Sequence, residues 1–243
     1  MAVTAGVSIG VSAPTGAATT IALTTSGAVP AASRIVIAAG GWDSLARTIT
    51  GVSGGGLTWV EDADAQHASG EVVGVYSADA PSGLASGTVI TVTFSASVDD
   101  RFVGGWYMQG AVTGSNPATY RGTVVNGNSQ GTGTGWTTGN MASIDAGALI
   151  FAATNNAWAT PATRTSAPVA PSVEIHDIMV SSEFGDYVSE YQTIASAGTY
   201  AVAGTLSASG DHKITVGIEY LAAAEAQAAG AQIYYKMLRG IGL

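Results

Sequence analysis

The chain has 243 residues, which suits one large β domain or two small ones and is enough to bury a core without structural staples. It contains no cysteine, which excludes thiolate zinc sites, disulfides and thiol-dependent catalysis. Only 10% of its residues are charged and its formal net charge is -9, so most of its surface would repel a phosphate backbone and we expect no nucleic-acid partner.

The first ten residues, MAVTAGVSIG, lack the basic region and the continuous apolar region of a secretory signal. The sequence also has no run of about 18 apolar residues, the length that a membrane span requires. We therefore expect a protein that is made in the cytoplasm and has no membrane partner. A mean hydropathy of +0.30 together with so few charges is unusual for a free soluble monomer. This combination predicts that neighbouring molecules cover much of the surface.

The predicted elements are short β-strands separated by clusters of Gly, Ser, Asn and Asp, a pattern typical of an all-β sandwich. In chain order, the clearest strand segments are SRIVIAAGGW (33–42), EVVGVYSAD (71–79), TVITVTFSA (88–96), RFVGGWYMQG (101–110), GALIFAATNN (147–156), GTYAVAGTL (198–206) and HKITVGIEY (212–220).

Two of these strands alternate, as a strand buried on one face does. In 88–96 the alternation places Ile90, Val92 and Phe94 on one face. The inner face of 212–220 is predicted to carry Ile214, Val216, Ile218 and Tyr220. Segments 33–42 and 147–156 are apolar on both faces, which predicts central strands covered on two sides.

The two halves of the chain resemble each other, since segment 33–44 matches 147–158 in pattern and 83–109 matches 195–221. We therefore predict an all-β fold, a jelly-roll-like antiparallel β-sandwich with pseudo-duplicated halves and a short C-terminal helical tail. The predicted divisions are an N-terminal segment (1–29), the sandwich (30–221, with halves at about 30–115 and 140–221) and the tail (222–243). Two separate small sandwiches are the alternative.

Two segments are expected to lie outside the sheets. Residues 126–140, NGNSQGTGTGWTTGN, have a low-complexity composition that predicts a flexible loop or crossover. The alanine-rich tail is predicted to be helical and to bind a partner surface. Its clustered apolar residues are the predicted assembly contacts: Ile233, Tyr234, Tyr235, Met237 and Leu238.

The stretch GGGLTWVEDADAQ (54–66) combines three glycines with three acidic residues. The glycines predict a turn with positive φ, followed by a solvated edge strand in which Asp62 and Asp64 share one face. The acidic run lacks both the glycine and the distal glutamate of a calcium loop, and no Lys-Ser/Thr pair follows the glycines as in a phosphate-binding loop. We predict neither a metal site nor any cofactor.

Other residues that could carry chemistry do not form a recognisable motif. Glu174 and His176 lie on the same side of a predicted extended segment and are the best local pair, although solvated strand residues are the favoured interpretation. There is no G-x-S-x-G serine elbow. Paired carboxylates for glycoside cleavage remain an open alternative, because the sequence does not give their separation. The acids considered for that role are Glu61, Asp62, Glu174, Glu183 and Asp186.

Three tryptophans are candidates for stacking on sugar rings. Trp136 lies in the predicted loop, and Trp42 and Trp158 lie at equivalent strand ends of the two halves. A role in the core is the favoured interpretation for each.

The strand-and-turn pattern of RIVIAAGGW, GLTWVEDADA, VYSADAPSGLASGTVITVTFSASVDDRFVGGWYMQG and GTYAVAGTLSASGDHKITVGIEYLA resembles jelly-roll domains of bacteriophage virion proteins, often described as minor tail or structural proteins. The resemblance covers about residues 30–222 and supplies no functional residues. It implies a non-enzymatic tail or capsid-associated protein that assembles in the host cytoplasm as a homo-oligomer, with other virion proteins as partners. The alternative is a module that binds carbohydrate or a host receptor, with a host-surface glycan as partner.

Overall fold

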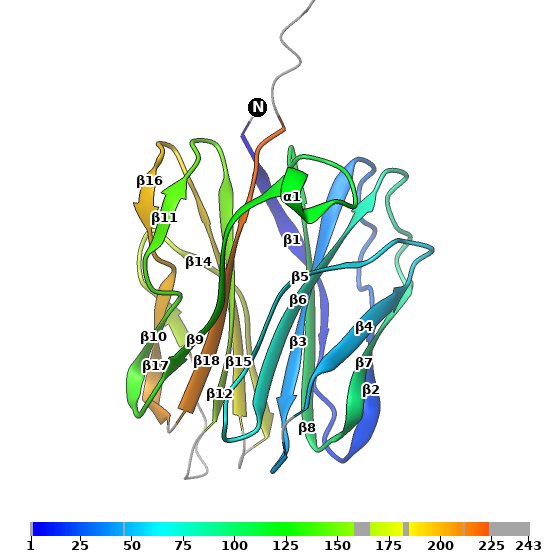
Figure 1. The fold of residues 1–243 in the computed structure, drawn as a ribbon. Helices are drawn as coiled ribbons and strands as arrows, with labels where there is room; N and C mark the ends of the chain where they lie inside the picture. Colours follow the sequence, from blue (N-terminus) through cyan, green and yellow to red (C-terminus); the bar gives the residue numbers. More distant parts are fainter. Residues whose placement is uncertain (1, 46, 158–165, 182–184, 211, 224–243) are drawn as a thin grey trace, which may run out of the picture.

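The computed structural model describes residues 2–45, 47–157, 166–181, 185–210 and 212–223. Within these ranges the fold is antiparallel β-structure with one short helix, α1 (Pro117–Tyr120). The sheets are stacked in layers across the molecule (Figure 1). The predicted all-β antiparallel sandwich is therefore confirmed, whereas residues 224–243 of the predicted helical tail lie outside the described residues.

The first half of the chain forms a five-stranded sheet in the order β1-β8-β3-β6-β5 and a three-stranded sheet in the order β2-β7-β4. Its strands are β1 (Thr4–Ser12), β2 (Ala18–Thr24), β3 (Ser33–Trp42), β4 (Ile49–Gly54), β5 (Val60–Gln66), β6 (Glu71–Ala80), β7 (Val89–Val98) and β8 (Asp100–Gln109).

The second half repeats this strand order. Its five-stranded sheet runs β14-β15-β12-β18-β9, its three-stranded sheet runs β10-β17-β13, and β11 pairs with β16. The strands are β9 (Arg121–Gln130), β10 (Gly133–Thr137), β11 (Met141–Ile144), β12 (Leu149–Ala157), β13 (Ser166–Pro168), β14 (Val173–Ser181), β15 (Gly185–Thr193), β16 (Gly198–Tyr200), β17 (Ala203–Gly210) and β18 (His212–Tyr220).

The repeated order follows the sequence duplication. Strand β12 takes the position of β3, and the pair β17–β18 takes the position of β7–β8, as the matched segments predict. In the first half, β1, β8, β3 and β6 lie side by side, and β2, β7 and β4 form the facing sheet. In the second half, β9, β18, β12 and β15 take the same order, and β10, β17 and β13 form the facing sheet. This order is characteristic of a jelly roll.

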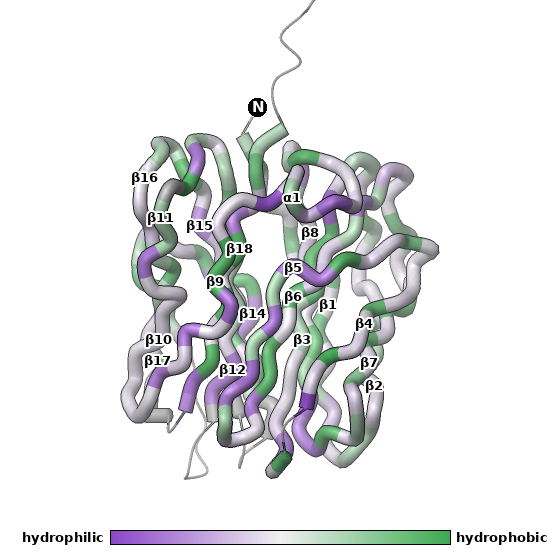
Figure 2. Tube along the Cα trace, viewed as in Figure 1, coloured by the Kyte–Doolittle hydropathy of each residue, from purple (hydrophilic) through white to green (hydrophobic). Residues whose placement is uncertain are grey.

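Three hydrophobic cores hold the layers together. One lies between the two sheets of the first half and another between the sheets of the second half. The third joins the two five-stranded sheets and includes Val36, Phe102, Trp106, Phe151 and Tyr187. Each half is therefore a sandwich with its own core, and a shared core joins the two halves. Hydrophobic residues recur along the strands of both central sheets (Figure 2).

The central strands are apolar on both faces because each face meets a different core. In β3, Ile35 and Ile37 point into the core of the first half, whereas Val36 and Ala38 point into the shared core. The predicted alternation in β7 and β18 is also confirmed. Ile90, Val92 and Phe94 are buried, and residues 214, 216, 218 and 220 line the shared core.

Two segments differ from their expected places. Residues 4–12 and 18–24, in the predicted N-terminal segment, form β1 and β2 of the first half. Most of residues 126–140, predicted to be a flexible loop, belong to β9 and β10. Their Gly and Thr residues still form strands because the sheets beside them supply hydrogen bonds and packing, which outweigh weak local propensity.

Candidate functional site

The glycine-rich stretch leads into a buried carboxylate that joins the two halves. Gly54, Gly55 and Gly56 have φ values of 117°, 65° and 66°, as predicted for a glycine turn, and β5 is an edge strand. A register shift between Glu61 and Ala63 marks a β-bulge, which breaks the predicted alternation. As a result Asp62 is 2% exposed, whereas Asp64 remains exposed.

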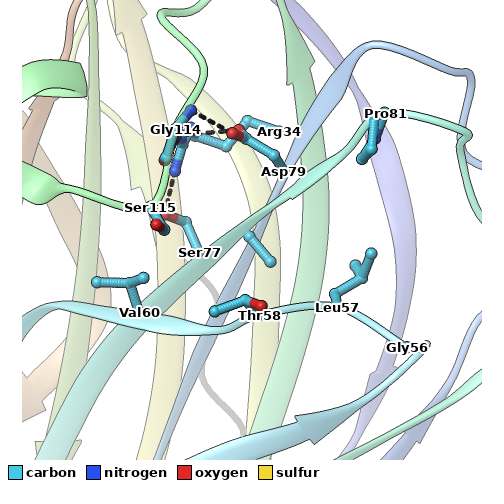
Figure 3. Close-up of a pocket in the computed structure, with 11 residues that line it drawn as sticks. Arg34, Gly56, Leu57, Thr58, Val60, Ser77, Asp79, Pro81, Gly114 and Ser115 are labelled. Carbon is cyan, nitrogen blue, oxygen red and sulfur yellow. Dashed lines mark hydrogen bonds and ion pairs between the residues drawn. The ribbon is translucent and has the colours of Figure 1, made fainter.

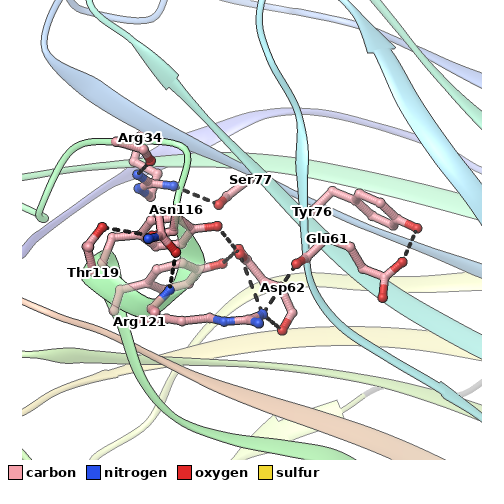
Figure 4. Close-up of polar contacts among 12 residues, drawn as sticks. Arg34, Glu61, Asp62, Tyr76, Ser77, Asn116, Thr119 and Arg121 are labelled. Carbon is pink, nitrogen blue, oxygen red and sulfur yellow. Dashed lines mark hydrogen bonds and ion pairs between the residues drawn. The ribbon is translucent and has the colours of Figure 1, made fainter.

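Asp62 accepts hydrogen bonds from two tyrosines that are far away in the sequence. The Tyr120 hydroxyl donates to Oδ1 at 2.5 Å, and the Tyr220 hydroxyl donates to Oδ2 at 2.6 Å. Arg121 donates to the backbone carbonyl of Asp62, and its Nη1 lies 3.9 Å from the carboxylate (Figure 4). This cluster, here called the Asp62 joint, connects β5 of the first half to α1 and to the last strand of the second half.

The two tyrosines of the joint remain protonated donors. Burial, followed by the nearby negative charge of Asp62, raises the pKa of Tyr120 and that of Tyr220 well above the usual value of 10. Each hydroxyl therefore donates to one oxygen of the same carboxylate. Because the carboxylate is 2% exposed and hydrogen-bonded to both tyrosines, the arrangement holds the two halves together.

Arg34 fixes the connection between the halves beside this joint. Its guanidinium lies 3.5 Å from the centre of the Tyr120 ring and pairs with Asp79 at 2.7 Å. It also donates to Ser77 and to the carbonyls of Val112 and Gly114. Arg34 is 3% exposed, and the contacts named above all lie within the protein.

A pocket of about 280 Å³ lies next to Arg34 (Figure 3). Leu57 and Thr58 line one part of it, and Ser77, Asp79 and Gly114 line another. The backbone N–H of Gly114 donates to Asp79, which also holds Arg34. The charged groups at this pocket therefore neutralise each other, and we assign it no ligand.

A second hollow, of about 220 Å³, lies where the edge strands β1 and β14 meet. We call it the β1–β14 groove, and its lining includes Gly6, Val7, Ser8, Val173, Glu174 and Tyr191. Strand β1 is the edge of the first five-stranded sheet and β14 is the edge of the second. The groove therefore marks the seam between the two halves on one side of the molecule.

A hydrogen-bonded chain of side chains crosses this seam. Ser8 Oγ lies 2.7 Å from His176 Nε2, and His176 Nδ1 lies 3.0 Å from Ser189 Oγ. The ring reaches this place because Gly104 has no side chain, since a Cβ there would lie 2.7 Å from Nδ1. Burial lowers the pKa of His176 to about 4, so the imidazole is neutral near pH 7.

The Ser8–His176 pair resembles the first two members of an acyl-transfer triad, but its surroundings serve a different purpose. A serine hydroxyl occupies the position in which such triads hold a carboxylate to stabilise the imidazolium. The backbone N–H of Gly10 donates to Ser8 Oγ itself, at 3.2 Å. The arrangement therefore suits a neutral bridge between the halves.

Glu174 and His176 do not lie on the same side of their strand, as the sequence suggested, and His176 is buried rather than solvated. A bulge between these residues places Glu174 opposite Glu190 and His176 opposite Ser189 in β15. Because neighbouring strand residues point to opposite faces, the two side chains diverge. Glu190 is fully buried, and burial together with Glu174 raises its pKa to about 8.

Of the three candidate tryptophans, the two that are described, Trp42 and Trp136, lie in different halves. Trp136 is 1% exposed and lies in the core of the second half, which confirms the favoured core interpretation, although its segment forms strand β10 and not the predicted loop. Trp42 lies at the end of β3, half-buried, with its Nε1 donating to the carbonyl of Ser69. Trp158 lies outside the described residues, and so do the predicted assembly contacts between 233 and 238.

The described carboxylates among those considered for glycoside cleavage are also dispersed. Glu61 accepts a hydrogen bond from Tyr76, and Asp62 belongs to the joint. Strand β5, which carries both, is at the opposite edge of its sheet from β1, whereas Glu174 lies in β14 beside β1. Asp186 is fully buried in the second half, and Glu183 lies outside the described residues.

Within the described ranges, no three His, Asp or Glu side chains gather as potential metal ligands. In the same part of the chain, no helix has the length and apolar character needed to cross a membrane.

Comparison of the chain with protein-family models, with curated proteins and with solved structures gave no significant match.

Sequence reasoning missed both the Asp62 joint and the Ser8–His176 bridge. Tyr220 was predicted on the inner face of its strand, which is the face that meets Asp62. For Asp62 the acidic run predicted solvent exposure, and only the bulge reverses it. Ser8 lies between two register shifts in β1, so alternation does not reveal its direction.

Proposed function

We propose that the chain is a non-enzymatic structural component of a bacteriophage virion, a tail or capsid-associated protein that acts through contacts between subunits. Its partners are further copies of itself and other virion proteins. The observation that carries the proposal is the apolar surface on neighbouring sheet edges. Four of the seven large hydrophobic side chains exposed in the described residues lie on β1 and β14: Val7, Val11, Val173 and Met179.

Unpaired sheet edges and exposed apolar residues favour association, and soluble monomers usually protect such edges with charges. This chain has few charges with which to do so, since only 10% of its residues are ionised. Jelly rolls are also a common architecture of viral capsid proteins, although the same fold occurs in lectins, so the fold supports the class of protein without deciding its role.

The proposal is tested by measuring the mass of the purified full chain with light scattering over a wide range of concentrations. We expect a mass that is a multiple of the 24.1 kDa monomer, with symmetric particles visible by negative-stain electron microscopy. A mass of one monomer at every concentration would contradict it.

The glycan-binding alternative has lost one of its three proposed contacts, because Trp136 is buried in the core. Trp42 and Trp136 lie in different halves, and the described residues contain no exposed tryptophan platform.

A further inference from the structure

We propose that the β1–β14 groove is the docking site for the C-terminal segment, residues 224–243, of a second copy of this chain. The inference rests on the proposed function, because it assumes that copies associate, and it assigns a surface and an occupant to that association.

The size of the groove favours a single side chain over a small-molecule ligand. Its volume is about 220 Å³, whereas ligand pockets usually hold roughly 300–1,000 Å³. Val7, which is 64% exposed, and Val173, which is 44% exposed, both line it. The lining also includes Tyr191 and Trp106, whose rings stack with centres 5.6 Å apart. A lining of apolar and aromatic side chains suits an aromatic or aliphatic anchor, the type of residue that dominates interface energetics.

The backbone of the two edge strands favours side-chain docking over the addition of a strand. Strand β1 has register shifts between Ala5 and Ser8 and between Ser8 and Gly10, and β14 has two of its own. Such bulges interrupt the regular row of peptide groups that another strand would need. The occupant must therefore bind mainly through its side chains.

The C-terminal segment supplies suitable anchors. It contains Ile233, Tyr234 and Tyr235 in succession, followed by Met237 and Leu238. The described chain ends at Ala223, whose N–H donates to the carbonyl of Gly110. Gly110 lies against Ala2, so the segment leaves the body close to the start of β1.

Charge also favours this occupant. Residues 224–243 contain Glu225, Lys236 and Arg239, a net charge of +1, which leaves -10 on the remainder of the chain. The groove is bordered by Glu174, and one oxygen of that carboxylate has no hydrogen-bond partner among the described residues. Burial and the nearby Asp177 raise the pKa of Glu174, and a cation beside it would offset both effects by stabilising the ionised carboxylate. Lys236 follows directly after the two tyrosines and can provide that cation.

The experiment compares full-length variants with the unmodified chain by light scattering and sedimentation. Changing Val7→Ser with Val173→Ser alters the groove, and Tyr234→Ser with Tyr235→Ser alters the tail. Either change is expected to weaken association about tenfold or more. Leu45→Ser is the matched control, because Leu45 is 60% exposed and does not line the groove, and it should leave association unchanged. The double reversal, Glu174→Lys with Lys236→Glu, should associate better than either single reversal.

Contact between two copies is distinguished from contact within one by mixing. Groove-altered and tail-altered chains each lack one half of the contact, and a mixture of the two should associate more strongly than either alone. A photo-crosslinker at position 7 should join isotopically heavy to light chains through residues 224–243.

If the unmodified chain associates and the tail and groove variants associate equally well, the docking inference is wrong although the proposed function stands. Cross-links confined to single chains would also overturn it. If the unmodified chain stays monomeric, the proposed function itself fails.

Discussion

The hydroxyl of Tyr220, in the last strand of the second half, donates to the carboxylate of Asp62, in an edge strand of the first half, at 2.6 Å. Tyr120, from the connection between the halves, donates to the other oxygen of the same carboxylate. One buried acid therefore links three segments that the sequence separates widely. The shared hydrophobic core brings the five-stranded sheets together, and this joint adds directional contacts that define how they meet.

Changing Asp62→Ala should strongly destabilise the protein. The substitution leaves two buried tyrosine hydroxyls without an acceptor, and each such loss costs about 1–3 kcal/mol. We expect the free energy of unfolding, measured by urea titration, to fall by about 2–5 kcal/mol in total. Asp64→Ala, on the same strand but exposed, is the matched control and should change it by less than about 0.5 kcal/mol. Equal effects of the two substitutions would show that the joint contributes nothing particular.

Arg34→Lys should also destabilise the protein although it conserves the charge. Lysine cannot stack a planar guanidinium on Tyr120, and it cannot reach Asp79, Ser77 and the two carbonyls of the connection together. We expect a loss of about 2–4 kcal/mol in the same urea titration. The control is Arg47→Lys, which changes a partly exposed pair with Asp43 and should cost no more than about 1 kcal/mol. Faster hydrogen exchange in residues 110–120 of the Arg34 variant would locate the effect at the connection.

Much of the fold could be predicted from the sequence, because period-two alternation reports burial directly. Strand β7 shows this on one face, and β3 shows it through apolar residues on both faces. The duplication in the sequence also identifies the corresponding strands of the two halves. These signals are local, and they require only that each strand be regular.

The sites were harder to predict because they depend on irregular strands. A bulge turns Asp62 inward, and another separates Glu174 from His176. The position of a bulge depends on the partner strand, which a single sequence does not reveal. Trp136 was assigned to a loop for a related reason: its glycine-rich neighbours predicted one, but pairing of β10 with β17 buries it.

His176 should make the protein less stable as the pH falls. Burial lowers the pKa of His176 from the usual 6.5 to about 4. Between these two pH values the imidazole is protonated in the unfolded chain and neutral in the folded chain. The stability that depends on a neutral ring is complete above pH 6.5 and is lost as the pH falls towards 4, by up to about 3 kcal/mol. The measurement is the urea midpoint between pH 4 and 7, compared with His176→Gln, which should remove this dependence. Ser8→Ala keeps the buried ring and should retain it.

Glu190 should produce the opposite dependence at higher pH. Burial, with a smaller effect of the negative charge on Glu174, raises the pKa of Glu190 from the usual 4.5 to about 8. The folded chain therefore holds a proton that the unfolded chain releases, and the associated stability is complete below pH 4.5 and lost as the pH rises through 8. Glu190→Gln keeps the shape and stays neutral, so it should be more stable than the unmodified protein at pH 8, with a difference that vanishes near pH 4. Gln192→Glu provides the converse comparison, because residue 192 is buried on the same face of β15 and a second acid there should steepen the decline. A constant difference between Glu190→Gln and the unmodified chain across this range would show that Glu190 is ionised in the folded protein.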